Sequence, residues 1–190
     1  ASREVRQLTT ERFRDYYASW APDGKSLYYI SRRGLKSVVM RISIDNLHSE
    51  KIASRRSLLT TAMPSLDGEI LAIGEIKEVQ GRMRRIFLLR GDRFTPLSTE
   101  GIMPSVIDWQ GRDILAYAAT RYSPGNSTEE ILSVNTLTGE TESAWKSTRY
   151  VGNPIISRDE KRVLWIENYN WKIWRIVVEE RPSARRWLVI

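Results

Sequence analysis

The stretch Trp20-Ala-Pro-Asp-Gly-Lys-Ser-Leu-Tyr-Tyr-Ile30 decides the fold class, because it joins two short apolar segments through a tight polar turn. Related stretches begin at Met63, Met103 and Asn153. In each stretch one apolar residue marks the start of the second segment after the turn, and these residues are Leu27, Leu71, Ile114 and Val163. Successive members are 44, 43 and 49 residues apart. A repeat of this length is typical of a β-propeller, in which each repeat forms one four-stranded blade. The sequence therefore predicts an all-β propeller of four-stranded antiparallel blades.

Alternating apolar and polar residues divide the chain into about four blades within one propeller domain, residues 1–190. The expected blades cover approximately residues 10–55, 56–99, 100–148 and 149–190. An extra outer strand is expected at residues 4–9, although the last blade already has an outer strand of its own. This surplus strand suggests that the blades belong to a larger ring, or to a ring that a partner chain closes.

The composition limits the chemistry that the chain can perform. A chain of 190 residues can bury a substantial core without metals or disulfides. With no cysteine and one histidine, His48, it has no thiolate ligand, no Cys nucleophile and no multi-histidine zinc site. No apolar run reaches the roughly 18 residues of a membrane span. We expect no metal site, no cofactor and no membrane-spanning segment.

The net charge of +7 favours acidic partners such as nucleic acid, an anionic membrane surface or an acidic protein face. The basic residues are spread along the chain in short clusters, unlike the dense tract of a nucleic-acid-binding arm. We therefore expect no direct binding of nucleic acid. The absence of cysteine suits an oxidising compartment, and this favours an exported protein, in the periplasm or outside the cell.

Aspartates and tryptophans recur along the blades, and both patterns have structural explanations. The recurring aspartates are expected to cap the backbone of hairpin turns, and they are Asp23, Asp67, Asp108 and Asp159. The tryptophans in or next to predicted strands are expected to pack between blades, and they are Trp20, Trp109, Trp165, Trp171 and Trp174. For Trp171, stacking on a sugar or a base is a second possibility. No residue is expected to be catalytic.

Residues Gln7–Thr9 and Tyr17–Gly34 resemble the TolB-like propeller repeat, whose pattern is an outer Gln-Leu-Thr followed by Trp-Ser-Pro-Asp-Gly-Lys-x-Leu. The later repeats match at decreasing strength: the second lacks the turn proline, and the fourth has Glu160 in place of glycine. The resemblance implies that the repeat residues are structural. The family includes periplasmic TolB, which binds partners on its propeller face. It also includes propellers of prolyl-oligopeptidase-type enzymes and sensor modules of membrane-bound winged-helix regulators, which act in signal transduction and transcription regulation.

In a propeller, two kinds of loop meet on one face: those from an outer strand to the next inner strand, and those from a second to a third strand. Here these loops carry nine basic and four acidic residues, and the set is Arg12, Arg14, Asp15, Arg32, Arg33, Lys36, Lys77, Glu78, Arg82, Arg121, Glu129, Glu130, Arg149 and Tyr150. We predict that a partner binds on this loop face. The candidate contact residues are Arg14, Tyr16, Arg32, Arg33, Arg121, Arg149 and Tyr150.

The favoured function is a non-enzymatic recognition or sensory module that binds an acidic protein or peptide partner. One alternative is the propeller domain of a prolyl-oligopeptidase-type hydrolase, whose catalytic domain would lie outside this chain. Direct binding of an anionic polysaccharide or nucleic acid is a weaker alternative.

Overall fold

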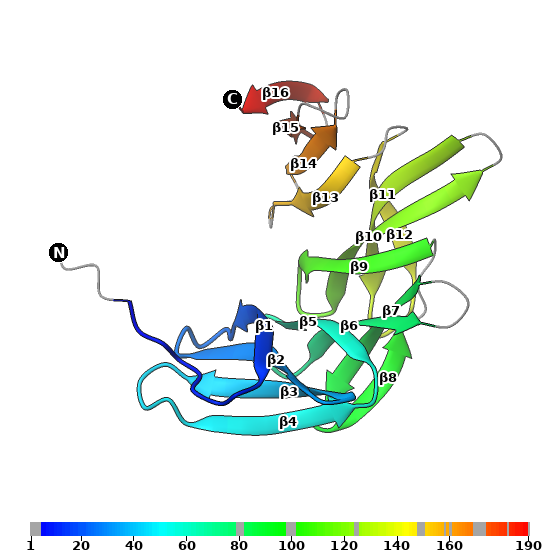
Figure 1. The fold of residues 1–190 in the computed structure, drawn as a ribbon. Coiled ribbons are helices and arrows are strands. Elements are labelled where there is room, and N and C mark those ends of the chain that lie inside the picture. The colour runs from blue at the N-terminus through cyan, green and yellow to red at the C-terminus, as the bar shows by residue number, and fades with distance from the viewer. Residues whose placement is uncertain are drawn as a thin grey trace.

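Sixteen antiparallel strands form four sheets in the computed structural model of this protein (Figure 1). The structure describes residues 5–78, 82–97, 102–123, 126–147, 151–157, 159, 161–168, 174–181 and 183–189. Among these residues there is no helix, and so none with the length and apolar character needed to cross a membrane. The predicted all-β class and the four-stranded antiparallel blades are confirmed.

Each sheet is a meander whose strands pair in chain order. The first sheet contains β1 (Arg14–Trp20), β2 (Ser26–Arg33), β3 (Lys36–Ser43) and β4 (Ser49–Arg55). The second contains β5 (Leu58–Pro64), β6 (Leu71–Glu78), β7 (Arg82–Arg90) and β8 (Arg93–Leu97). The third contains β9 (Ile102–Trp109), β10 (Ile114–Ser123), β11 (Asn126–Asn135) and β12 (Thr141–Ser147). The fourth contains β13 (Val151–Ile156), β14 (Arg162–Asn168), β15 (Trp174–Glu180) and β16 (Arg185–Val189).

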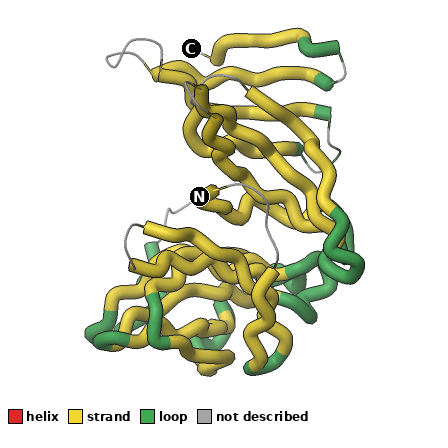
Figure 2. The backbone as a smooth tube through the Cα atoms, turned by 90° about the vertical axis from the view of Figure 1, so that its right-hand side faces the viewer, coloured by secondary structure: helices red, strands yellow, loops and turns green. Residues whose placement is uncertain are grey.

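The four sheets follow one another along an open arc, with the first and fourth sheets at its two ends (Figures 1 and 2). Each sheet therefore has a forward face, toward the next sheet in the chain, and a rear face, toward the preceding one. Side chains of successive strand residues alternate between these two faces. The first strands, β1, β5, β9 and β13, lie next to one another from sheet to sheet and form the inner side of the arc.

Apolar side chains fill the space between consecutive sheets. Between the first two sheets, the forward residues Tyr28 and Ile30 pack with the rear residues Leu59, Ile73 and Phe87. Similar clusters join the second sheet to the third and the third to the fourth. Fully burying one such side chain is worth about 1.5–3 kcal/mol. These interfaces are the hydrophobic core of the molecule.

The repeat is more regular in the structure than in the sequence. The last residue of an inner strand pairs with the apolar residue near the start of the second strand, as Trp20 does with Leu27 and Trp109 with Leu115. The third repeat is therefore anchored by the fully buried Leu115, and Ile114, which the spacing suggested, is one residue out of register. The turn of this repeat is one residue shorter, with Leu115 six positions after Trp109 where Leu27 follows Trp20 by seven, and this difference hid the correct alignment.

Trp109 and Trp20 occupy equivalent positions but differ in burial. The Trp109 side chain is 0% exposed, and its indole Nε1 donates to the carbonyl oxygen of Met63 in the preceding sheet, at 3.0 Å. Trp20 is 61% exposed, because no sheet stands behind the first one among the described residues. The expected packing between blades is confirmed for Trp109 and also for Trp165, which is 3% exposed. It is wrong for Trp20 and for Trp174, also 61% exposed, while Trp171 lies outside the described residues.

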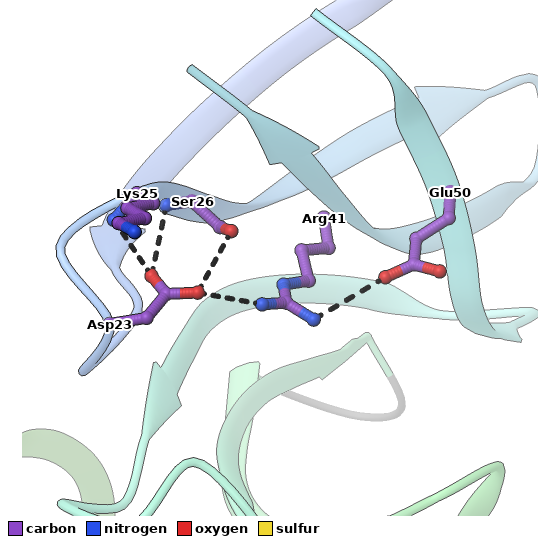
Figure 3. A network of polar contacts seen from close by, with 5 residues as sticks. All are labelled: Asp23, Lys25, Ser26, Arg41 and Glu50. Atoms are coloured by element: carbon purple, nitrogen blue, oxygen red, sulfur yellow. Dashed lines mark hydrogen bonds and ion pairs between the residues drawn. The ribbon is translucent and has the colours of Figure 1, made fainter. Parts of the chain in front are cut away.

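The hairpin turns between first and second strands are closed by aspartate side chains, as predicted for three repeats. Asp23 accepts hydrogen bonds from the backbone amides of Lys25 and Ser26, at 2.8 and 3.0 Å, and its other oxygen lies 2.8 Å from Arg41 Nη2 (Figure 3). The Lys25 amide, with the Ser26 and Arg41 contacts, holds the pKa of Asp23 below its usual value. Asp67 and Asp159 make corresponding turn contacts.

The fourth predicted turn aspartate, Asp108, is instead part of strand β9, and its carboxylate accepts from the amide of Trp109 at 2.8 Å. The third repeat thus closes its turn without the Ser-x-Asp arrangement of Ser65 and Asp67 or of Ser157 and Asp159. The turn is one residue shorter than in the other repeats, and the position that holds Asp23, Asp67 or Asp159, three residues after the end of the inner strand, is held here by Arg112.

The outer strand expected at residues 4–9 is not formed in the described part of the segment. Residues 5–10 have no regular secondary structure and cross the rear face of the first sheet. Leu8 packs there against a cluster of Tyr29, Val38, Met40 and Ile42. A strand needs a partner edge for its backbone hydrogen bonds, and the segment lies on a sheet face instead. It covers apolar side chains that elsewhere are covered by a preceding sheet.

Several glutamates are buried near the sheet interfaces. Glu75 lies on the rear face of the second sheet, 2.7 Å from Nε of Arg55, whose guanidinium also stacks over the Phe87 ring at 4.3 Å. Glu129 accepts a hydrogen bond from the hydroxyl of Thr120 at 2.8 Å. Burial raises the pKa of Glu129, and the Thr120 hydrogen bond only partly opposes this effect.

Replacing Trp109 by alanine should destabilise the protein by about 3–5 kcal/mol, because it removes a fully buried indole and leaves a cavity. The matched change Trp20→Ala should cost less than about 1 kcal/mol, because that side chain is mostly exposed. Urea unfolding followed by far-UV circular dichroism measures both. Equal losses for the two variants would contradict the inter-sheet role assigned to Trp109.

Replacing Glu129 by glutamine should stabilise the protein at pH 7 and have no stabilising effect near pH 4. The folded-state pKa of Glu129 is raised above 4.5, so the native state binds more protons than the unfolded chain above that pH. The contribution of Glu129 to stability is therefore largest below about pH 4.5 and falls as the pH rises through the folded-state pKa. Thermal midpoints across this pH range, with the exposed Glu142→Gln as control, measure the difference. A gain that did not depend on pH would show that ionisation of Glu129 is not its source.

Candidate partner-binding face

The strand directions bring two kinds of connection to one end of the sheets, here called the loop end. It holds the start of β1, the β2–β3 hairpin and the link from β4 to β5. Cross-strand pairs define it, because Arg14 lies opposite Arg32, and Arg33 lies opposite Lys36. The turn end, at the other side, holds the turns of Asp23, Asp67 and Asp159. The predicted loop face thus exists as one end of the molecule.

Arg32 and Arg33, two of the predicted contact residues, are engaged within the fold. Because neighbouring strand residues point to opposite faces, Arg32 lies on the forward face and Arg33 on the rear face. Nη1 of Arg32 donates to the hydroxyl of Ser37 and to the carbonyl oxygen of Ser57, at 3.1 and 2.9 Å, and so joins the first sheet to the start of the second. Reversing the charge of Arg32 would break this junction.

Arg33 holds the N-terminal segment against the first sheet. Its Nη2 lies 2.6 Å from a carboxylate oxygen of Glu11, and its guanidinium lies 4.5 Å from the ring centre of Phe13. Glu11 neutralises the charge of Arg33 locally. From the sequence, both arginines were expected in one cluster of loop charges. In the structure they point to opposite faces of the sheet, and each has a partner within the fold.

The tyrosines of β1 lie in an irregular part of the strand. Tyr16 is half-buried against the interface of the first two sheets, and its hydroxyl is buried with no hydrogen-bond partner among the described residues. A bulge separates Tyr16 from Ser19 in the pairing with β2. Within this bulge Tyr17 has a φ of 55°, which is unusual for a bulky residue, and its side chain is 57% exposed. Of the two rings, that of Tyr17 is the more exposed, while a contact of Tyr16 with a partner stays a prediction.

The remaining predicted residues are only partly located. Arg121 lies in β10 opposite Thr128, next to the hairpin that joins β10 to β11, so its backbone is at the loop end. Its side chain is not described. Arg149 and Tyr150 lie outside the described residues. Their proposed contact with a partner stays a prediction.

Exposed basic side chains do gather at the loop end, but the set differs from the predicted one. Those of the first two sheets are Arg14, Lys36, Arg56, Arg84 and Arg85. Only Arg14 was among the predicted contact residues. Two basic pairs in the sequence, Arg55-Arg56 and Arg84-Arg85, could have indicated this exposed set, because each pair lies beside a connection at the loop end.

The acidic residues at the loop end are mostly withdrawn from solvent. Glu75, Glu129 and Glu130 are buried, with 3%, 7% and 4% of their surface exposed. Glu130 is paired with Lys146 at 3.0 Å. At the turn end, by contrast, exposed arginines face acids: Arg41 contacts Asp23 and Glu50, and Arg112 contacts Asp67 and Glu69. Among the described residues, exposed basic side chains occur at both ends, but at the turn end exposed acids such as Asp23, Glu50, Asp67 and Glu69 accompany them.

No three histidine, cysteine, aspartate or glutamate side chains gather into a metal-type cluster within the described residues.

Comparisons with known proteins identify the fold. No family model matches the sequence, and no curated protein matches it. Among solved structures, the chain is similar to TolB from Acinetobacter baumannii, with a TM-score of 0.71 at 14% identity over 95% of this chain and 44% of that one. It is also similar to a putative TolB from Agrobacterium tumefaciens, with a TM-score of 0.71 at 17% identity over 97% of this chain and 65% of that one.

A third similar structure is the β-propeller domain of the trilobed protease from Pyrococcus furiosus, with a TM-score of 0.61 at 15% identity over 88% of this chain and 56% of that one. This chain thus spans less than two thirds of the length of each of the three. Likeness at such low identity concerns the fold and not the activity. The protein has the fold of the TolB-like β-propellers.

Proposed function

We propose that this propeller is a non-enzymatic recognition module that binds an acidic protein or peptide segment at its loop end. The supporting observation is the balance of charge: Arg14, Lys36, Arg56, Arg84 and Arg85 are exposed at this end, while Glu75, Glu129 and Glu130 there are buried and the exposed Glu11 is paired with Arg33. An extended field of one sign speeds the encounter with a partner of opposite sign.

The loop end also offers features that could fix the position of a bound segment. Tyr17 is exposed on the inner strand β1, three residues from Arg14, and its ring packs edge-on against Tyr16 at 4.9 Å between centroids. Tyrosine and arginine are enriched among residues that contribute most to binding. In this proposal the basic side chains attract an acidic segment, and Tyr17 contacts an apolar residue within it.

We further propose that the module works outside the cytoplasm, as an exported recognition or sensor domain. The absence of cysteine is compatible with an oxidising compartment. The TolB-like fold agrees with this assignment without establishing it.

A hydrolase propeller is the second candidate function. It is favoured by the likeness to the propeller domain of a protease. In that case the loop end would admit or orient a peptide for a catalytic domain in another part of the protein. Binding of an acidic peptide by this chain alone, without a catalytic domain, separates the first proposal from the second.

Reversing two loop-end charges should weaken the binding of an acidic peptide about tenfold. The variant is Arg14→Glu with Lys36→Glu, which avoids the structural partners of Arg32 and Arg33. Each exposed charge contact is worth about 0.2–1 kcal/mol, and reversal adds repulsion. A fluorescein-labelled Glu/Asp-rich peptide serves as the probe, with affinity measured by anisotropy from about 50 to 500 mM salt, since screening shortens the field to about 8 Å or less at and above physiological salt.

The matched control is Lys25→Glu with Arg93→Glu, two exposed basic residues at the turn end. It changes the net charge equally and should leave most of the affinity intact. An affinity that does not depend on salt, or an equal loss in both double variants, would overturn the assignment of the loop end as the binding site.

Replacing Tyr17 by glycine should weaken peptide binding while leaving the protein at least as stable. Glycine adopts positive φ without the cost of about 1–2 kcal/mol that an L-residue carries, and this gain offsets the lost ring contact of about 0.5–1.5 kcal/mol. Peptide affinity and the urea midpoint are measured on the same sample. A destabilised variant with unchanged affinity would show that Tyr17 has a structural role instead.

A further inference from the structure

Two arginines lie directly opposite each other at the loop end of the first sheet. Arg14 of β1 pairs with Arg32 of β2, so both side chains point to the same face, with about 4.5–5.5 Å between their Cβ atoms. This is the forward face, because Nη1 of Arg32 reaches the carbonyl oxygen of Ser57 beside the second sheet. Arg14 is exposed, and Arg32 is half-buried. Two positive charges are thus held side by side at the loop end of the first interface between sheets.

Neither of these arginines is neutralised within the described part of the chain. Arg32 donates from Nη1 to neutral oxygen atoms only, and neither Arg32 nor Arg14 forms an ion pair there. The carboxylate of Glu75 lies in the same interface but is bound to Arg55 at 2.7 Å. Asp15 points to the rear face by strand alternation. Like charges directly opposite each other on neighbouring strands repel, so an anion bound between Arg14 and Arg32 would remove a repulsion that the fold leaves uncompensated.

Two hydroxyl groups of the same interface are buried without a hydrogen-bond partner among the described residues. Tyr16 follows Arg14 by two residues and shares its face, and the Tyr16 hydroxyl is one of them. The hydroxyl of Ser57 is the other, although the carbonyl group of Ser57 is bonded to Arg32. Buried polar groups nearly always have a partner, so unpaired ones call for an explanation. A bound acceptor atom would supply it.

A second pair of opposed arginines shows the contrast. Arg90 and Arg93 lie opposite each other at the turn end of β7 and β8, and both are exposed. Asp92, in the hairpin between them, places a carboxylate close by in the sequence. No buried side-chain atom without a partner is found among the described side chains of β7 and β8. Opposed arginines alone therefore do not make a site, and this second pair serves as a control.

We propose that Arg14 and Arg32, with the hydroxyls of Tyr16 and Ser57, bind one oxyanion group, either a carboxylate or a phosphate. A guanidinium group binds both kinds of oxyanion through two parallel N–H donors. Nε and Nη2 of Arg32 form one edge of its guanidinium and make no hydrogen bond within the described residues, so this edge is available for such a contact. The inference rests on the function proposed above, because it identifies the place where one acidic group of the bound segment is held.

Inorganic phosphate is the first probe, because it tests the arginine pair without a peptide. The arginine Nε–H signals in NMR spectra should show saturable binding as phosphate rises from about 0.5 to 20 mM, with the ionic strength held constant so that screening does not change. Arg14→Gln should weaken this binding at least about tenfold, because it removes one of the two charged donors. Arg93→Gln removes an equal charge from the control pair and should bind phosphate like the wild type.

Two hydroxyl deletions distinguish binding from folding. Ser57→Ala keeps the carbonyl group that Arg32 contacts, and Tyr16→Phe keeps the packed ring. Because neither hydroxyl has a partner within the described fold, each variant should be as stable to urea as the wild type without phosphate. Each should nevertheless weaken phosphate binding about fivefold, because a hydrogen bond to a charged group is lost. A hydroxyl with a purely structural role would give the opposite pattern.

Three short peptides then identify the bound group. They are neutral at both ends and differ at one position, which holds glutamate, phosphoserine or glutamine. The same NMR signals should show tighter binding of both charged peptides than of the glutamine peptide, and this difference should disappear in Arg14→Gln. The tighter of the two charged peptides shows whether the natural group is a carboxylate or a phosphate, and either order supports the proposal.

Three results would overturn the proposal. They are an absence of saturable phosphate binding, an equal loss of binding in Arg14→Gln and Arg93→Gln, and a destabilised Ser57→Ala or Tyr16→Phe with unchanged phosphate affinity. Failure of the proposed function looks different: phosphate binding that depends on Arg14, without any binding of the Glu/Asp-rich peptide, would keep the oxyanion site and reject the recognition module. Binding of the Glu/Asp-rich peptide that Arg14→Gln leaves intact would keep the module and reject the site.

Discussion

The need to cover two apolar faces on every four-stranded sheet governs this structure. A single sheet of this kind has no core of its own, so each one becomes stable only when its neighbours remove its faces from water. Within the arc, consecutive sheets meet this need for one another through clusters such as Ile30 with Leu59 and Ile73. Polar contacts across the interfaces, such as Arg55 with Glu75, then fix how the sheets are placed.

The two ends of the arc meet the same constraint differently. The first sheet has its rear face covered by an irregular segment anchored by Leu8 and by the Glu11–Arg33 pair. The fourth sheet has no such cover within the described residues, and its aromatic and aliphatic side chains remain exposed. Trp20 and Trp109 occupy the same position in their repeats but differ in burial. Trp109 is fully buried because a sheet lies behind it, whereas Trp20 is exposed because none of the described sheets does.

The candidate binding end follows from the direction of the strands. Because every second strand runs the same way, the β2–β3 hairpin, the β4–β5 link and the start of β1 are brought to one end. The sequence could place residues near this end but not choose among them. Arg32 and Arg33 are adjacent in the chain, yet one bonds to Ser57 and the other to Glu11. The exposed set instead includes Arg56, Arg84 and Arg85, from connections whose accessibility depends on neighbouring sheets.

The sequence by itself determined the fold class, the number of blades in the chain and the chemistry of most hairpin turns. These are local properties: period-two alternation and Asp-Gly turns act within about ten residues, so Asp23 and Asp67 could be assigned without knowing what surrounds them. The tertiary structure decided which apolar residues are buried and which charges face solvent. Burial depends on the presence of a second sheet, so the exposure of Trp20 could not be read from its own repeat. Asp108 was misjudged because the turn that follows it is one residue shorter than in the other repeats, and the strand pairing that shows this joins residues on both sides of the turn.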